Sequence, residues 1–349
     1  MNEQKKGQAI IAVRGLKKHF PIKKGSFSRS TGTVRAVDGV SFEIMKGEVF
    51  GLVGESGCGK STLGMTILRA YDTTAGEIIF TDKNGTQHPI HQYSYAKMKP
   101  LRREMQVVFQ DPFSSLSPRM NVRDIIAEPL LITGAVSRRD MDDRVAAALQ
   151  SVGLNPSYMR RYPHAFSGGQ RQRISIARAL VLDPSFVVAD EAVSALDVSV
   201  QAQILELLRE LKSKHDQTYL FVSHDLGVVN YFCDRVAVMY VGHIVEIASA
   251  REIFINPRHP YTEALTQAIP IPDPKRRKEV RALPGEVADP ANPPSGCPFH
   301  PRCAYAQGRC AAERPELRNV PAVDGGAHTV ACHFSESLDL AAAFGHMDL

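Results

Sequence analysis

Apolar runs alternate with amphipathic stretches along most of this chain, and the alternation predicts a mixed α/β fold. Short apolar runs are typical of buried strands in a parallel sheet, and they occur at residues 48–53, 186–190 and 219–222. Stretches with apolar side chains at helical spacing follow them, at residues 60–70, at residues 171–182 and from Val198 onward, where Ile204, Leu207, Leu208 and Leu211 share one face. A core sheet covered by helices is therefore expected.

The regions around this core have other patterns and predict further parts of the molecule. An N-terminal antiparallel β subdomain is expected from residues 8–13, 34–44 and 77–81. Residues 111–163 read as mainly helical, with an amphipathic segment at 142–152, and they predict an inserted helical signalling subdomain at about 111–167. After Pro270 the composition becomes rich in Pro, Ala and Cys, so we predict one domain over residues 1–270 and a C-terminal extension over residues 271–349.

Composition and charge narrow the class of protein. With 349 residues, 44% hydrophobic and 23% charged, the chain resembles a soluble globular protein of two or three domains. No apolar run reaches the roughly 18 residues of a membrane-spanning helix, and residues 1–6 are polar, so a place in the cytoplasm is expected. Residues 1–35 hold nine Lys or Arg and one acidic residue, whereas the whole chain has a net charge of +5, so the remainder is slightly acidic. A general nucleic-acid surface is not expected, and the basic segment is either a solvated face or a neighbour of lipid headgroups or nucleotide.

One motif predicts a nucleotide-binding loop. Residues 54–62 read Gly-Glu-Ser-Gly-Cys-Gly-Lys-Ser-Thr and lie between a predicted strand and a predicted helix. Glycines in such a loop let backbone N–H groups turn toward a phosphate, the lysine neutralises phosphate charge, and the following serine offers a hydroxyl to Mg²⁺. The helix that follows points its positive N-terminus at the phosphates. The predicted ATP-binding residues are Gly54, Glu55, Ser56, Gly57, Cys58, Gly59, Lys60, Ser61 and Thr62.

A second motif restricts the family. Ser167, Gly168, Gly169 and Gln170 precede the amphipathic stretch 171–182, so they predict either an ordinary helix N-cap or a second anion site at a helix N-terminus. One nucleotide cannot easily use both sites of one chain. Together the two motifs resemble those of the ATP-binding subunits of ABC transporters, in which two subunits pair head to tail and each signature motif covers the ATP held by the partner.

The resemblance implies roles for further residues. Asp190 and Glu191 end an apolar strand, where parallel sheets place their ligands; Asp190 would hold Mg²⁺ and Glu191 would polarise the attacking water, although such acids can also cap a following helix. Gln110 would contact Mg²⁺ and link the subunit to its membrane partner, and His224 would contact the γ-phosphate. Phe20 would stack on adenine. Asp197 matches the D-loop of the family, although it can also cap the helix that begins at Val198.

One position departs from the family. Ala192 follows Glu191, where the family usually has proline. The change frees the backbone φ angle and returns an N–H group, but it removes no catalytic side chain. We therefore expect the ATPase activity to survive.

Four of the six cysteines lie in the extension, at positions 297, 303, 310 and 332. Disulfides are not expected in a reduced cytosol, so a metal site competes with four free thiols. The spacing lacks the C-x-x-C pairs of common zinc modules, although His300, His328 and His333 could complete a zinc site. Four thiolates also suit an iron–sulfur cluster, and spacing alone leaves these alternatives open.

Two segments of the chain connect these cysteines to a family. Residues 256–262 read Asn-Pro-Arg-His-Pro-Tyr-Thr and residues 297–303 read Cys-Pro-Phe-His-Pro-Arg-Cys. Both resemble the C-terminal extension of the dipeptide and oligopeptide importer ATPases, and nearly the whole chain is similar to their F-type subunit. The resemblance implies a [4Fe-4S] cluster on Cys297, Cys303, Cys310 and Cys332, with Zn²⁺ as the alternative and no metal role for Cys58 or Cys233. We expect this site to lie outside the nucleotide machinery and to have a structural or assembly role.

The sequence therefore predicts an ATP-hydrolysing subunit of a bacterial importer of di- or oligopeptides, with ATP and Mg²⁺ as its cofactors. The resemblance implies as partners a second, related ATP-binding subunit in a heterodimer, two integral membrane permease subunits and a substrate-binding protein; no nucleic acid is expected. The expected place is the cytoplasmic face of the inner membrane, as a peripheral subunit. The transported solute stays open among dipeptides, oligopeptides, glutathione and nickel.

Two other functions compete with this one. A soluble ABC ATPase acting on DNA or ribosomes would typically carry tandem cassettes or long coiled-coil insertions, and the sequence shows neither. A catalytically silent partner subunit would be expected to lack the residues at positions 191 and 224, whereas Glu191 and His224 are both present.

Overall fold

The computed structural model describes residues 7–23, 30–134, 137, 139–269 and 283–342 of the chain. The chain forms two compact units that each combine distant segments. Unit 1 contains Met1–Ala12, Glu43–Val49 and Ile78–Val222, and unit 2 contains Val13–Phe42, Phe50–Glu77 and Ser223–Leu349. The polar segment 1–6 and the boundary predicted at Pro270 lie outside the described residues.

Unit 1 is built on parallel strands, as the apolar runs predict. β6 (Met105–Val108), β7 (Phe186–Asp190) and β8 (Thr218–Ser223) are parallel neighbours, with Val107 opposite Val188 and Val188 opposite Leu220. All residues of β7 and β8 are buried, which explains why their sequences are apolar runs rather than alternating patterns. The α/β class is confirmed.

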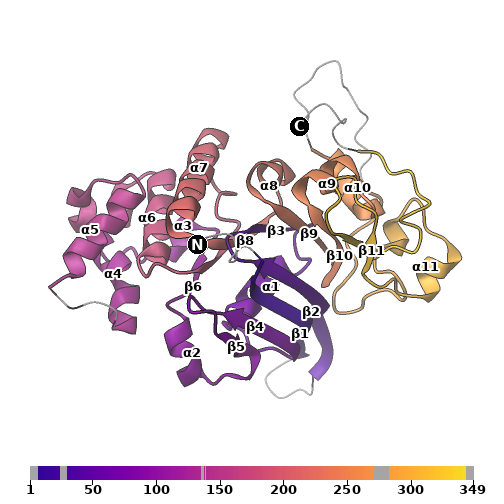
Figure 1. The fold of residues 1–349 in the computed structure, drawn as a ribbon, viewed down its shortest axis with the longest axis horizontal. Coiled ribbons are helices and arrows are strands. Elements are labelled where there is room, and N and C mark those ends of the chain that lie inside the picture. The colour runs from indigo at the N-terminus through magenta and orange to yellow at the C-terminus, as the bar shows by residue number, and fades with distance from the viewer. Residues whose placement is uncertain (1–6, 24–29, 135–136, 138, 270–282, 343–349) are drawn as a thin grey trace. The chain divides into compact units, whose positions relative to one another are not determined.

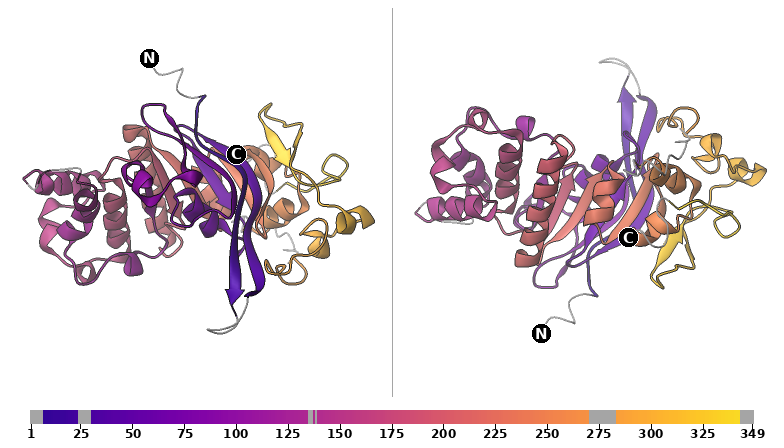
Figure 2. Two further views of the ribbon diagram at one scale, coloured as in Figure 1. Left: turned by 90° about the horizontal axis from the view of Figure 1, so that it is seen from below. Right: turned by 90° about the horizontal axis from the view of Figure 1, so that it is seen from above.

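A helical group follows β6 in unit 1, and it confirms the mainly helical interpretation of residues 111–163. Its elements are α3 (Pro112–Ser115), α4 (Val122–Thr133), α5 (Met141–Ser151), two short 3₁₀ turns at Pro156–Arg160 and Pro163–Ala165, and α6 (Gly168–Leu180). Helices α4, α5 and α6 pack against one another, and both turned views show them as one group (Figures 1 and 2). Buried Ile126, Leu130, Leu149 and Ile174 supply apolar contacts within it. Unit 1 also contains α2 (Tyr95–Leu101) and α7 (Val198–His215).

The antiparallel sheet expected near the N-terminus is present but longer than expected. Its order is β2 (Ser30–Met45), β1 (Ala9–Lys23), β4 (Ala75–Thr81) and β5 (Gln87–Pro89). The sequence predicted the first of these strands only over residues 8–13. Gly15 has φ +54°, a local irregularity, and strand pairing then continues to Lys23, so Phe20 lies within a strand.

Unit 2 contains a second group of strands, in the order β11, β12, β10, β9 and β3. β3 (Val49–Val53) is parallel to β9 (Arg235–Tyr240), and β10 (His243–Ser249) is antiparallel to β9. The other strands come from the C-terminal extension: β12 (His328–Val330) pairs with β10, and β11 (Arg318–Val320) pairs with β12. The extension is therefore part of the sheet, which its sequence did not predict.

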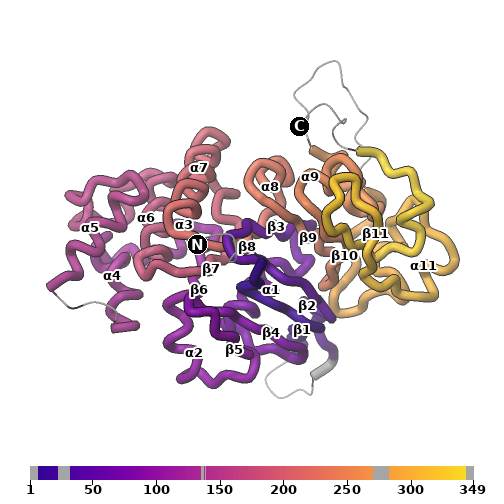
Figure 3. The backbone as a smooth tube through the Cα atoms, in the orientation of Figure 1, coloured from indigo at the N-terminus to yellow at the C-terminus, as the bar shows by residue number. Residues whose placement is uncertain are grey.

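Short helices accompany these strands. They are α1 (Lys60–Ile67), α8 (Leu226–Phe232), α9 (Ala250–Ile255), α10 (Pro260–Gln267) and α11 (Gly308–Ala312), with a 3₁₀ turn at His300–Arg302. Helix α1 ends earlier than the predicted residue 70, because the backbone reaches the left-handed region at Arg69, with φ +55°. Figure 3 shows that much of the extension around α11 and β11 has no regular secondary structure.

A buried charged cluster attaches β12 to the rest of unit 2. His328 Nε2 lies 2.7 Å from Glu246 Oε1 on β10, and its Nδ1 lies 3.3 Å from Glu252 Oε2 on α9. The side chains of His328 and Glu246 are fully buried. A protonated imidazole can donate from both ring nitrogens, so one histidine can satisfy both carboxylates. The backbone N–H groups of Val323 and Asp324 also donate to Glu252, which adds a second link to the extension.

Replacing His328 by alanine is expected to destabilise unit 2 strongly. The change removes the partner that two buried side chains, Glu246 and Glu252, share, and losing one partner of a buried hydrogen bond costs about 1–3 kcal/mol. Thermal unfolding followed by circular dichroism should show a clearly lower midpoint. His164→Ala is the matched control because His164 is exposed. Equal midpoints for the two variants would contradict a stabilising role of the cluster.

Candidate nucleotide-binding site

The phosphate loop of unit 2 joins β3 to α1, and two of its glycines have no room for a side chain. Gly54 has φ +152°, and a Cβ there would lie 2.1 Å from the carbonyl oxygen of Met239. Gly59 has φ +109°, and a Cβ there would lie 2.0 Å from the carbonyl oxygen of Ala36. Both positions therefore require glycine, for backbone conformation and for space.

Lys60 is the charged group of this loop. Its side chain is buried, and Nζ donates hydrogen bonds to the carbonyl oxygens of Gly54 (2.7 Å) and Glu55 (3.0 Å). These contacts hold the ammonium group at the centre of the loop. Ser56 and Gly57, at the turn, are exposed. A phosphate group placed at the turn would meet the backbone N–H groups and the lysine charge together.

Cys58 belongs to the packing of this loop. Its thiol is buried, and Sγ lies 3.9 Å from Lys60 Nζ. Burial raises the pKa of the Cys58 thiol, against the opposing effect of the lysine charge. A thiol with a raised pKa is a poor nucleophile, so Cys58 acts as a small apolar side chain here.

Two residues that the sequence did not assign to the site hold the outer side of the loop. The backbone N–H of Glu55 donates to the hydroxyl of Tyr261 (2.8 Å), and the Glu55 carboxylate accepts from Nη1 (2.7 Å) and Nη2 (3.0 Å) of Arg302. Tyr261 lies at the start of α10, where His259 caps the helix by accepting from the N–H of Tyr261. Both residues occur in the two segments that carry the family resemblance, which was the available signal.

This arrangement links the extension to the phosphate loop. Arg302 lies between Cys297 and Cys303 in sequence and forms an ion pair with Glu55 of the phosphate loop. The sequence did not predict this contact. The four-cysteine site itself was expected to lie outside the nucleotide machinery, and that stays a prediction.

In unit 1 the two acids after β7 have different environments. Asp190 is the last residue of β7 and is buried, whereas Glu191 is partly exposed. Glu191 has φ +47°, a left-handed conformation that is strained for a residue with a side chain, and its N–H donates to the carbonyl oxygen of Val222 (2.9 Å). Gln110 Nε2 donates to Glu191 Oε2 (2.8 Å), although 81 residues separate the two positions. The structure thus brings together two of the predicted site residues.

The signature motif begins α6 in unit 1. The hydroxyl of Ser167 accepts from the N–H of Gln170 (3.4 Å), and the side chain of Gln170 accepts from the N–H of Ser167 (3.1 Å), forming a capping box. A Cβ at Gly169 would lie 2.6 Å from Val200 of α7. The helix N-cap interpretation is therefore correct, and it leaves the N-terminus of α6 able to face an anion.

Asp197 caps α7 in the same unit. Its Oδ1 accepts from the N–H of Val200 (3.0 Å) and from the hydroxyl of Ser199 (2.7 Å). These hydrogen bonds lower the pKa of the Asp197 carboxyl. The capping role predicted for Asp197 is confirmed, and its place at a dimer interface stays a prediction.

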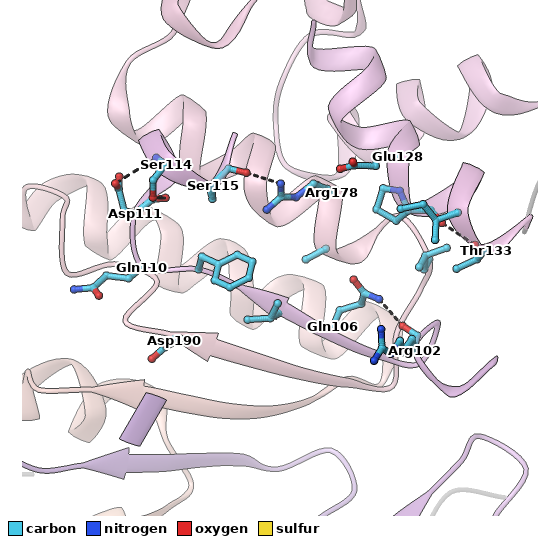
Figure 4. A pocket seen from close by; sticks show the side chains of 16 residues that line it. Arg102, Gln106, Gln110, Asp111, Ser114, Ser115, Glu128, Thr133, Arg178 and Asp190 are labelled. Atoms are coloured by element: carbon cyan, nitrogen blue, oxygen red, sulfur yellow. Dashed lines mark hydrogen bonds between the residues drawn. The ribbon is translucent and has the colours of Figure 1, made fainter. Parts of the chain in front are cut away.

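A groove of about 720 Å³ lies between the end of β6 and the helical group of unit 1 (Figure 4). Gln110 and Asp190 lie at one end of it, and Glu128, Thr133 and Arg178 line the other parts. Arg178 donates to the carbonyl oxygen of Ser115 (2.6 Å), and burial lowers the pKa of its guanidinium. Exposed apolar side chains, Phe109 and Ile132, also line the groove. A concave surface with exposed apolar side chains is typical of a binding site.

Two further predicted residues lie in unit 2. Phe20 of β1 packs edge to face on Tyr71, with ring centroids 5.6 Å apart, and the ammonium of Lys18 lies 4.7 Å from its ring centre. An aromatic ring beside a cationic group suits an adenine base, but adenine stacking on Phe20 stays a prediction. His224 follows β8 and is exposed.

The four extension cysteines gather around one cavity of about 20 Å³. Phe299, Tyr305 and Phe334 also line it. Burial raises the pKa of Cys297, and it raises the pKa values of Cys303 and Cys332 to about 11, with the neighbouring thiols adding to the shift. Within the described residues no group of three or more His, Cys, Asp or Glu side chains has an arrangement that could hold a metal ion.

Among the described helices none combines the length and the apolar character that crossing a membrane requires.

Two regions of the chain match known families. Residues 37–194 match the family described as "ABC transporter", and residues 245–310 match the one described as "Oligopeptide/dipeptide transporter, C-terminal region".

Individual proteins give the same result. The chain is 48% identical to the oligopeptide transport ATP-binding protein AppF of Bacillus subtilis, over 93% of this chain and 97% of that protein. It is 50% identical to a putative peptide import ATP-binding protein of Brucella ovis, over 89% of this chain and 94% of that protein. Its fold is similar to the dimeric ATP-binding cassette MJ0796 bound to ADP and phosphate, with a TM-score of 0.59, 27% identity and coverage of 69% of this chain and 99% of that one.

Proposed function

The chain belongs to the family of ABC transporter ATP-binding subunits, and from this premise we propose that it binds and hydrolyses ATP to energise the import of di- or oligopeptides, as the F-type subunit of a bacterial transporter. The proposal rests on two features that occur together in this chain. One is an intact phosphate loop, and the other is the match of residues 245–310 to the oligopeptide and dipeptide transporter C-terminal region. The likeness to relatives named for peptide transport supports the choice of peptide.

The roles of the nucleotide residues follow from their surroundings. Lys60, now held by two loop carbonyl groups, would exchange them for phosphate oxygens. Glu191 would accept a proton from the attacking water, and its hydrogen bond to Gln110 orients the carboxylate for this. Mg²⁺, when bound, would offset the charge that develops on the phosphates. The hydroxyl of Ser61 and the side-chain oxygens of Asp190 and Gln110 are donors of the kind that Mg²⁺ prefers.

A second ATP-binding subunit would complete each site. Ser167, Gly168 and Gly169 begin α6, so their N–H groups can receive the phosphates of an ATP bound to another subunit. Asp197, exposed at the start of α7, would lie at the same interface. We propose a related but different chain as this partner, and a substrate-binding protein as a further component of the transporter.

Permease subunits would dock in the groove of Figure 4. The groove exposes the side chain of Ile132 by 64% and that of Phe109 by 39%, and these apolar side chains would be covered by a permease segment. Docking there would place the ATPase at the cytoplasmic face of the inner membrane.

We also propose a division of the chain into a nucleotide-binding domain over residues 1–270 and an extension over residues 271–349, with the helical subdomain at about 111–167.

Glu191→Gln should bind ATP normally and turn it over about two orders of magnitude more slowly, because the amide cannot accept the proton from water. Steady-state phosphate release by the assembled transporter measures the loss, and equilibrium ATP binding measures what is retained. Glu206→Gln removes an exposed carboxylate on α7 and should match the parent. Turnover close to that of the parent in the Glu191 variant would exclude Glu191 as the base.

Ile132→Asp should uncouple the ATPase from its permeases. A charged side chain in an apolar contact must lose water without gaining a partner, so we expect roughly tenfold less peptide uptake and less permease recovered with the purified subunit. Leu131→Asp is the matched control, because Leu131 is also exposed on α4 but does not line the groove. Normal uptake by the Ile132 variant would argue against docking in this groove.

For the extension we propose a [4Fe-4S] cluster on Cys297, Cys303, Cys310 and Cys332, with Zn²⁺ as the alternative. The support is the donor set: four thiols line one cavity. Because the cavity measures about 20 Å³, a cluster would have to move these side chains outward. Binding would also require the thiols to lose their protons, which their raised pKa values oppose until the metal is present.

Protein purified without oxygen is expected to be brown, to absorb broadly near about 400 nm and to contain roughly four iron and four sulfide per chain. Cys303→Ser should lose this absorbance. Cys233→Ser should keep it, because Cys233 does not line the cavity. Stoichiometric zinc would replace the cluster with a zinc site, and protein without metal would leave four free thiols.

A further inference from the structure

We propose that Arg302 is a positioning residue for the ATP site: it holds the phosphate loop through Glu55, so that the nucleotide affinity of the chain depends on its C-terminal extension. The inference rests on the proposed binding of ATP at the phosphate loop. It does not require a metal at the four cysteines.

The ion pair has the geometry of a fixed fork. Nη1 and Nη2 of Arg302 each donate to one oxygen of Glu55, at 2.7 and 3.0 Å. Two parallel bonds of this kind fix orientation as well as distance. Nε of Arg302 donates to the carbonyl oxygen of Pro284 (3.1 Å), so every type of guanidinium nitrogen has a partner. The Arg302 side chain is only 7% exposed, which separates this pair from the solvated ion pairs of the surface.

Glu55 is the residue of the loop through which such a pair can act. Three of its groups are held: the carboxylate by Arg302, the backbone N–H by Tyr261, and the carbonyl oxygen by the ammonium of Lys60. The position of the Glu55 carbonyl group, which accepts from Lys60, therefore depends on the contacts of Glu55 with Tyr261 and Arg302. A substitution at Arg302 could shift Glu55 and, through it, the ammonium group of Lys60 that is proposed to bind phosphate.

The charge of Glu55 gives the pair a second effect. A carboxylate in the phosphate loop repels the triphosphate of ATP, and the repulsion is large where solvent is partly excluded. The Glu55 side chain is 26% exposed, so water screens it only in part. The Arg302 guanidinium, held by two hydrogen bonds to the Glu55 carboxylate, cancels this charge.

The extension holds Arg302 in place by packing. Phe299 lies near the rings of Tyr240 and Tyr261, with centroids 5.3 Å apart in both cases. Phe299 and Arg302 belong to one tight turn, in which the N–H of Arg302 donates to the carbonyl oxygen of Phe299 (3.0 Å). The same turn lies between Cys297 and Cys303, so whatever orders these cysteines also orders the arginine.

Arg302→Met should weaken binding of Mg²⁺-ATP by about tenfold, because the Glu55 carboxylate then stays unpaired and repels the triphosphate. Isothermal titration of the full chain, in a Glu191→Gln background that prevents turnover, measures the dissociation constant. Arg318→Met is the matched control, since Arg318 is an arginine of the extension that pairs with Glu336 instead. Its affinity should equal that of the parent. Arg302→Lys, which keeps the charge without the fork, should be intermediate.

A second substitution separates the charge effect of the pair from general damage to the extension. Adding Glu55→Gln to Arg302→Met removes the unpaired carboxylate and should recover affinity to within about threefold of the parent, because the repulsion is gone and only the orientation by the fork is still missing. Affinity unchanged in Arg302→Met would overturn the proposal, as would a loss that Glu55→Gln fails to recover or that Arg318→Met shares. Thermal unfolding of each variant checks that it folds, and Arg302→Lys serves if Arg302→Met does not. Failure of the parent to bind ATP would instead refute the proposed function.

Discussion

The close packing of the phosphate loop against β9 is the constraint on which the rest of unit 2 depends. At Gly54 the distance from a hypothetical Cβ to the Met239 carbonyl oxygen is 2.1 Å, so loop and strand touch backbone to backbone. This contact brings the carbonyl groups of Gly54 and Glu55 within reach of Lys60. The next residue of β9, Tyr240, lies beside Arg302 and Phe299 of the extension. One strand therefore carries the nucleotide loop on one part of its surface and the extension on another.

The extension is joined to this sheet by a buried charged cluster as well as by strand pairing. Removing two carboxylates and an imidazole from water is costly, and apolar side chains of similar volume would often serve stability better. In the observed register of β12 on β10 the imidazole of His328 lies between Glu246 and Glu252, and a slip by one residue would turn it to the other face of the sheet. The same register fixes where the chain leading to β12 passes. Accurate placement of the extension is useful when one of its residues, Arg302, must reach the phosphate loop.

Local sequence predicted the parts of this molecule that local chemistry determines. The buried strands β3, β7 and β8 were visible as apolar runs, and the phosphate loop was visible because glycine is required at fixed places. The full length of β1 was not, since pairing with distant strands carries it past Gly15. The contacts of Arg302 and Tyr261 with Glu55 join positions 247 and 206 residues apart, and no periodicity reports such a distance. The roles of Arg302 and Tyr261 can be recognised only from the folded structure, which places both residues beside Glu55.

In unit 1, hydrogen bonds hold Glu191 in a strained backbone conformation. A residue with a side chain persists at φ +47° only where its surroundings hold it. The N–H of Glu191 donates to the Val222 carbonyl oxygen, its carbonyl oxygen accepts from the N–H and the hydroxyl of Ser194, and its carboxylate accepts from the amide of Gln110. Gln110 also lines the groove in which we place the permease. If a permease segment docks there as proposed and shifts residues 109–111, it would reach the carboxylate proposed as the base through the hydrogen bond from Gln110. The backbone contacts with Val222 and Ser194 would keep Glu191 in its left-handed conformation, so losing the Gln110 bond would release the carboxylate alone.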